Sequence, residues 1–154
     1  MRLEYFEMID SVEELDLDRG HIKTISRVPE QSPVFEGHFP THPLLPGVML
    51  LETMNHASGY LHIARSQLTR LPLFIGVKKG KFRQFVTPGM VLRTTADLIH
   101  DGSGFGVTDA FIELDGKKIA DAEITMSLVE FPTAELGAEV RRRAQKIGVP
   151  SGEN

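Results

Sequence analysis

The feature that most constrains the fold is the contrast between residues 47–66 and the chain that follows them. Residues 47–66 contain no proline, and their apolar side chains recur at steps of three and four. That spacing is typical of one face of an α-helix, and twenty residues would make a helix roughly 30 Å long. The helix is expected to begin near Pro46, because proline suits the first turn. The apolar stripe consists of Leu50, Met54, Ala57, Leu61 and Ala64.

Four strand-like segments come after this helix, with no second helix between them. They cover residues 71–86, 90–100, 104–116 and 117–131, and turn sequences separate them. The dipeptide Asp115-Gly116 between two apolar-rich runs predicts a hairpin. Strands that follow one another directly pair antiparallel, so the fold class is α+β.

Two further strands are expected before the helix, over residues 3–14 and 20–28, joined by the polar turn DLDRG. The pattern predicts an antiparallel sheet curled around one long helix. A sheet of this size cannot bury the helix completely, and its open edges favour a dimer.

The length of 154 residues favours one domain. Residues 1–132 are expected to form its body, and residues 133–154 a basic amphipathic helix or a frayed tail of the same domain. The last four residues, SGEN, are expected to be disordered.

Composition excludes several functions. The net charge of −4 gives no global sign of nucleic-acid binding, and the absence of cysteine excludes disulfides and thiolate chemistry. The acidic N-terminus does not resemble a signal peptide, and no run approaches the roughly 18 apolar residues of a membrane helix. A soluble, cytoplasmic protein without a membrane span is expected.

The segment before the helix combines a histidine with three prolines. Pro40, Pro43 and Pro46 fix their own φ and push the preceding residues toward extended geometry, so a stiff extended connector is predicted. A rigid link between a strand and a helix would need no more than this. However, His38 stands before the prolines, and a histidine can act as a base near neutral pH.

The helix start adds two further components. Unpaired backbone N–H groups at Gly47 and Val48 would carry the positive end of the helix dipole. Glu52 lies opposite the apolar stripe, and its neighbours on that face are Val48, Asn55, His56, Gly59 and Ile63. Exposure to solvent and partial burial are both compatible with this face, although its apolar members favour partial burial. Histidine, N–H donors and a carboxylate are the groups needed to remove a proton beside a carbonyl.

The other histidines carry weaker signals. His38 and His42 have metal-like spacing, but the prolines between them forbid the helix that a zinc motif requires. His42 is therefore assigned a structural or exposed role. His21, His62 and His100 have no motif around them and are assigned to the surface.

The segment GHFPTHPLLPGVMLLE resembles the signature of the FabZ-type 3-hydroxyacyl-[acyl-carrier-protein] dehydratases. Likeness extends over about residues 5–130. The resemblance implies a hot-dog fold, in which an antiparallel sheet wraps a central helix, and a homo-oligomer that is a dimer or a trimer of dimers. All fixed positions are met, namely Gly37, His38, Phe39, Pro40, Pro43, Pro46, Gly47, Val48 and Glu52.

The resemblance also implies a reaction, the dehydration of a 3-hydroxyacyl chain to a trans-2-enoyl chain. His38 would be the base, and Glu52, from the other subunit, would assist loss of the hydroxyl. Phe39, Gly47, Val48 and His56 are expected to contact the substrate, with the Gly47 N–H on the thioester oxygen. Neither a metal nor a redox cofactor is needed. A sister branch that also isomerises the double bond has aspartate in place of Glu52, so a plain dehydratase is favoured.

One position departs from the pattern, because His56 stands where the family usually has glutamine. Histidine can hold Glu52 equally well, but a charged imidazole would lower the pKa of Glu52 and weaken it as a proton donor. The stretch LLETMNHASGYL is similar to branches that handle long hydroxylated acyl groups of outer-membrane lipid. Two alternatives to the dehydratase are a hot-dog acyl thioesterase and a non-catalytic acyl-binding subunit.

The partner implied by the resemblance is acyl carrier protein, which is acidic and needs a basic docking surface. Such a surface is predicted at Lys78, Lys79, Lys81 and Arg83. A second basic cluster comprises Arg141, Arg142, Arg143 and Lys146. Each cluster is also compatible with an ordinary solvated charged surface.

Overall fold

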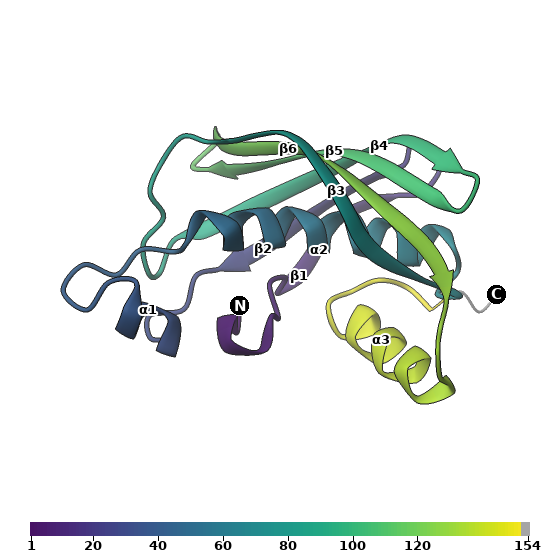
Figure 1. The fold of residues 1–154 in the computed structure, drawn as a ribbon, viewed down its shortest axis with the longest axis horizontal. Helices are drawn as coiled ribbons and strands as arrows, with labels where there is room; N and C mark the ends of the chain where they lie inside the picture. Colours follow the sequence, from purple (N-terminus) through teal and green to yellow (C-terminus); the bar gives the residue numbers. More distant parts are fainter. Residues whose placement is uncertain (152–154) are drawn as a thin grey trace.

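A six-stranded antiparallel sheet curves around one long helix in the computed structural model, which describes residues 1–151 (Figure 1). The spatial order of the strands is β1-β2-β4-β5-β6-β3, so β1 and β3 form the two edges. This arrangement confirms the predicted α+β hot-dog architecture. The strands are β1 (Ser11–Asp16), β2 (His21–Arg27), β3 (Arg70–Phe82), β4 (Val91–Gly102), β5 (Phe105–Leu114) and β6 (Lys117–Glu130).

The central helix α2 spans Gly47–Arg65, within one residue of the predicted range. Pro46 precedes it, and every member of the predicted apolar stripe is buried in the hydrophobic core. Burial of this stripe supplies most of the stability of such a helix, because its sequence propensity alone is weak. Within residues 1–151, no helix is both long and apolar enough to cross a membrane.

The hairpin predicted at Asp115-Gly116 joins β5 to β6. Both residues have positive φ, 51° for Asp115 and 78° for Gly116. Two consecutive positive φ values define the type I′ turn, whose twist matches that of the paired strands.

The strand predicted for residues 3–14 is wrong in its first half. Residues Leu3–Tyr5 form the short 3₁₀ helix η1, and Phe6 ends it in the left-handed region, with φ of 53°. Leu3 and Met8 are completely buried, so this segment covers the core instead of extending the sheet. β1 itself begins only at Ser11.

The extended connector predicted around the prolines is also wrong. Residues Pro33–Gly37 form the helix α1, whose first turn is capped by the Ser32 hydroxyl accepting from the Val34 N–H at 3.2 Å. After α1 the chain turns back on itself, and the Leu44 N–H donates to the His38 carbonyl at 2.9 Å. Residues 38–46, which include Pro40, Pro43 and Pro46, therefore form a compact loop between α1 and α2.

Helix α3 (Ala134–Lys146) lies on the side of α2 away from the sheet (Figure 1). The Thr133 hydroxyl caps its N-terminus by accepting from the Leu136 N–H at 3.2 Å. Ala144 is fully buried, and the chain after α3 is tied to β1 by the Val12 N–H, which donates to the Ile147 carbonyl at 2.7 Å. The segment is thus a packed helix. Beyond Ser151, the expectation of a disordered SGEN falls outside the described residues.

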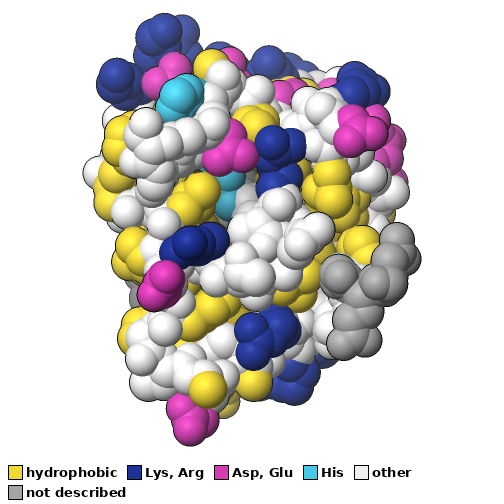
Figure 2. Space-filling model, turned by 90° about the vertical axis from the view of Figure 1, so that its right-hand side faces the viewer, with side chains coloured by type: hydrophobic (Ala, Val, Ile, Leu, Met, Phe, Trp, Pro, Cys, Tyr) yellow, Lys and Arg dark blue, Asp and Glu magenta, His cyan; other side chains and the backbone are white. Residues whose placement is uncertain are grey.

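The surface position predicted for His62 is wrong, since only 1% of it is exposed. Its ring occupies the space left by Gly106 on β5, and neither ring nitrogen has a hydrogen-bond partner among the described residues. A hollow of about 380 Å³ adjoins it at the end of α2, with Arg65 and Asp101 in its lining. Figure 2 looks onto this end of the molecule and shows acidic and basic side chains interspersed there. The lack of a motif around His62 gave no sign of this burial, which depends on a glycine of β5 that admits a polar ring.

Candidate active site

His38 follows α1 directly, at the start of the loop formed by residues 38–46. Its Nδ1 lies 2.9 Å from the carbonyl oxygen of Leu44. Because a carbonyl only accepts hydrogen bonds, Nδ1 carries the proton and Nε2 is the basic nitrogen. The ring also stacks on that of Phe39, with centroids 4.2 Å apart. The loop thus fixes both the tautomer and the direction of this histidine.

A hollow of about 610 Å³ lies between this loop and the N-terminus of α2. Gly47 lies at its edge, where the first N–H groups of α2 have no partner within the helix. A Cβ on Gly47 would approach nothing closer than Phe82, at 4.0 Å, so the space in front of this backbone is open. The lining consists of His38, Phe39, Leu44, Leu45, Gly47, Leu50, Phe82, Arg83, Gln84 and Phe85.

Glu52 lies on another face of α2, about 140° around the helix from Gly47. It is partly buried, and both carboxylate oxygens are held from the next turn of the same helix. The Nε2 of His56 is 2.9 Å from Oε1, and the amide of Asn55 donates to Oε2 at 3.0 Å. Burial raises the pKa of Glu52, but these two hydrogen bonds and the charge of His56 outweigh burial and leave that pKa below its ordinary value.

The structure therefore separates the predicted residues into two groups. His38, Phe39 and Gly47 share one hollow, whereas neither Glu52 nor His56 contributes to its lining. Val48 points to solvent and is 74% exposed. Within one copy of the described chain, the predicted base and the predicted carboxylate do not face a common cavity.

Several residues that shape these sites were given no role in the sequence analysis, although Asn55 was placed beside Glu52 there. Asn55 holds Glu52, and the Leu44 carbonyl orients His38. Asn55 was recognisable, because a residue three positions after a helical carboxylate lies beside it. By contrast, the contribution of a backbone carbonyl depends on loop conformation, and the place of Phe82 and Phe85 in the lining depends on how the end of β3 meets α2, neither of which leaves a signal in the sequence.

The predicted basic surface on β3 is exposed. The pairing of β3 with β6 is irregular between Lys78 and Lys81, where Lys79 has a φ of 55°. Next to it, Arg83 forms an ion pair with Asp121 and also lines the hollow of His38. Asp121 offsets the charge of Arg83 at this hollow, whereas the three exposed lysines precede Arg83 along the chain.

Two of the four cations in the basic cluster on α3 share one carboxylate of the same helix. Glu139 accepts from Arg142 at 2.7 and 2.9 Å and from Arg143 at 2.7 Å. These hydrogen bonds lower the pKa of Glu139 to about 2. Glu139 offsets part of the positive charge of this cluster, and such pairing weakens the attraction of an acidic partner.

Comparison with solved structures supports the class of fold. A thioesterase from Staphylococcus aureus aligns with a TM-score of 0.62 and 19% identity, covering 82% of this chain and 97% of that protein. A phenylacetic acid degradation-related protein from Ralstonia eutropha aligns with a TM-score of 0.61 and 19% identity, over 75% of this chain and 82% of that one. At such low identity these likenesses show the hot-dog fold alone.

Sequence comparison identifies the family. A family model described as a FabA-like domain matches residues 2–123. The 3-hydroxyacyl-[acyl-carrier-protein] dehydratase FabZ of Chlamydia pneumoniae is 35% identical over 128 residues, which cover 81% of this chain and 84% of that protein. The FabZ of Nitratiruptor is 34% identical over 132 residues, covering 81% and 88%. The chain belongs to the FabZ-type 3-hydroxyacyl-[acyl-carrier-protein] dehydratase family.

Proposed function

We propose that this protein removes water from a 3-hydroxyacyl chain carried on acyl carrier protein and forms the trans-2-enoyl chain. The observation that carries the proposal concerns His38. Its hydrogen bond to Leu44 leaves Nε2 as the basic nitrogen, and His38 lines the same hollow as Gly47 at the N-terminus of α2. Family membership supplies the substrate class, because the relatives are named for this reaction.

In the proposed mechanism, Nε2 of His38 takes the proton from the carbon next to the thioester carbonyl. Negative charge then develops on the thioester oxygen, which the N–H of Gly47 would stabilise at the positive end of the α2 dipole. The electron pair of the broken C–H bond forms the double bond as the C–O bond at carbon 3 breaks. The hydroxyl leaves as water, with assistance from Glu52.

Glu52 would come from a second copy of the chain. The support is twofold: Glu52 does not line the hollow of His38, and the edge strand β3 presents apolar side chains to solvent. An edge strand of this kind favours pairing with another copy. Dimers of this sort could assemble further into a trimer of dimers. The exposed apolar residues of β3 are Leu73, Phe74, Ile75, Val77 and Phe82.

The lysines of the β3 irregularity would receive the acidic carrier protein, because they are exposed on the strand whose last residue, Phe82, lines the hollow of His38. Phe39, Val48 and His56 remain proposed substrate contacts. The proposed location of the enzyme is the cytoplasm.

The test is absorbance of the conjugated enoyl thioester in either direction of the reaction. We expect the wild-type protein to interconvert the two thioesters and His38→Ala to lose at least about a hundredfold in rate, the usual contribution of a general base. A His38→Ala rate equal to wild type would refute the assigned base. Release of free thiol without enoyl formation would instead favour the thioesterase alternative.

A further inference from the structure

The imidazole ring of His56 contacts Glu52 on one side and borders open space on the other. On one side its Nε2 lies 2.9 Å from Glu52 Oε1. On the other side the ring borders two separate hollows of about 190 Å³ each. About a quarter of the His56 side chain (24%) is exposed. Because the Glu52 side chain is itself 30% exposed in one copy of the chain, the imidazole gives this carboxylate a second route to protons and water.

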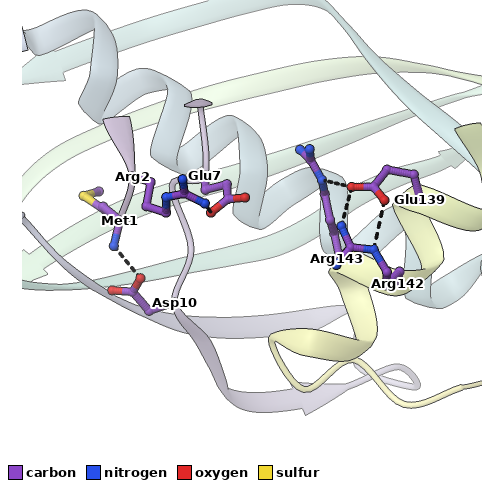
Figure 3. Close-up of polar contacts among 7 residues, drawn as sticks. All are labelled: Met1, Arg2, Glu7, Asp10, Glu139, Arg142 and Arg143. Carbon is purple, nitrogen blue, oxygen red and sulfur yellow. Dashed lines mark hydrogen bonds and ion pairs between the residues drawn. The ribbon is translucent and has the colours of Figure 1, made fainter. Parts of the chain in front are cut away.

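The first of these hollows lies between the N-terminal segment and α3, with His56 and Tyr60 of α2 also in its lining. Figure 3 shows the polar residues on its two sides, the N-terminal group to the left and the α3 group to the right. The second hollow lies between α2, β3, β6 and α3, and Asn55, Met126 and Val140 contribute to its lining.

Charged groups surround His56, but most of them are paired with one another. Arg2 pairs with Glu7 at 3.5 Å, the N-terminal amine pairs with Asp10, and Glu139 pairs with both of its arginines. The direct partner of the imidazole is Glu52. The titratable and charged groups bordering His56 are the N-terminal amine, Arg2, Glu7 and Asp10 of the N-terminal segment, Glu52 and Tyr60 of α2, and Arg142, Arg143 and Lys146 of α3.

The reaction proposed above needs a proton for the departing hydroxyl. The pKa of Glu52 lies below its ordinary value, so at neutral pH this carboxylate is ionised and has no proton of its own to give. A histidine changes charge near neutral pH and can hold that proton until it is needed.

We propose that His56 is the proton reservoir for the departing hydroxyl and acts through Glu52. Protonated His56 passes its Nε2 proton to Glu52 Oε1, and Glu52 passes a proton to the hydroxyl as the C–O bond breaks. His38 meanwhile holds the proton taken from the carbon, so one proton is removed, one is delivered, and water and the enoyl thioester result. His38 then releases its proton to solvent, and His56 regains one through the hollows it borders. The inference rests on the proposed dehydratase activity.

The test is the pH dependence of kcat in wild type, His56→Gln and Asn55→Ala. Wild type should give a bell-shaped profile, because the reaction needs a free base to remove one proton and a protonated donor to supply the other. Glutamine can still donate a hydrogen bond to Glu52 but has no titrating proton. Because glutamine is the residue usual in the family at this position, we expect His56→Gln to stay active with a lower kcat, and to lose the alkaline decline while keeping the acid limb.

Asn55→Ala is the matched control, because it removes the other hydrogen bond to Glu52 without removing a titrating group. It should lower kcat while preserving the bell shape. A wild-type profile with no alkaline decline would overturn the relay, and so would a His56→Gln profile with the wild-type shape and rate. Absence of enoyl formation by wild type would instead refute the proposed function, so the two failures are distinguishable.

Discussion

The imidazole ring of His62 lies so close to Gly106 that a Cβ built on residue 106 would stand 2.0 Å from its Cε1. Real Cβ atoms do not approach other atoms so closely. The buried histidine in α2 therefore requires glycine at position 106 of β5, and the contact between the two packs the central helix against the sheet.

Gly106→Ala should destabilise the protein by about 1–3 kcal/mol, the usual cost of overpacking a core. Denaturant unfolding measures the change. The double variant Gly106→Ala with His62→Ala should lose less stability than the two single variants added together, because shortening residue 62 removes the clash. Additive losses would show that the ring and the glycine do not meet.

Acid should weaken the fold through His62. Burial lowers the pKa of His62, opposed by Asp101 and assisted by Arg65, so the folded protein keeps this ring neutral. The unfolded chain binds a proton near pH 6.5 that the folded protein does not bind, so stability is lost as pH falls below about 6.5. His62→Leu should make the free energy of unfolding fall less steeply than in wild type between about pH 7 and 5. Parallel curves for the two proteins would contradict this assignment.

At Gly47, stability and activity should respond in opposite directions to one substitution. A methyl group there meets only Phe82, at 4.0 Å, and alanine favours the helix over glycine by up to about 1 kcal/mol. Gly47→Ala should therefore unfold at equal or higher denaturant concentration. Its methyl group would enter the hollow of His38, so we expect kcat/KM to fall at least roughly tenfold. Unchanged kcat/KM would mean that substrate does not approach this backbone.

Much of the fold could be predicted because its signals are local. The stripe of α2 repeats every three or four residues, and the Asp115-Gly116 turn depends on two residues alone. The errors occurred where tertiary contacts decide. The chain before Ser11 covers the core because Leu3 and Met8 find space there, and His62 is buried because Gly106 lies opposite it. Neither burial can be predicted from the sequence of one segment, because each depends on a segment far away in the chain.

The candidate site divides in the same way. His38 and Glu52 were recognisable from their spacing to the prolines and the helix, and α1 could have been found from Ser32-Pro33, a cap followed by proline in the first turn. The orientation of His38 by Leu44 was not predictable, since it depends on how the loop closes.

The lysines near the β3 irregularity should matter for the carrier protein and not for the chemistry. Lys79→Glu with Lys81→Glu should raise KM for carrier-bound substrate by about tenfold or more and leave KM for a small thioester analogue nearly unchanged. Arg19→Glu with Arg93→Glu is the matched control, because it makes the same charge change at exposed positions of the β1–β2 turn and β4, away from β3. A similar rise in KM for both double variants would show that KM responds to the total charge of the protein and not to these two lysines.

The proposal that each active site combines two subunits can be tested by mixing two inactive variants. His38→Ala lacks the base and Glu52→Gln lacks the carboxylate, so each homodimer should be inactive. A mixed dimer would contain one site with both mutated residues and one intact site. Random re-assortment should therefore restore roughly a quarter of wild-type activity, since half of the dimers are mixed and each has one intact site of two.

If the two residues act within one chain, every site keeps one defect and mixing restores nothing. Ile75→Asp on β3 should prevent the recovery, because a charge on this apolar edge opposes pairing, and sedimentation would show the accompanying loss of dimer.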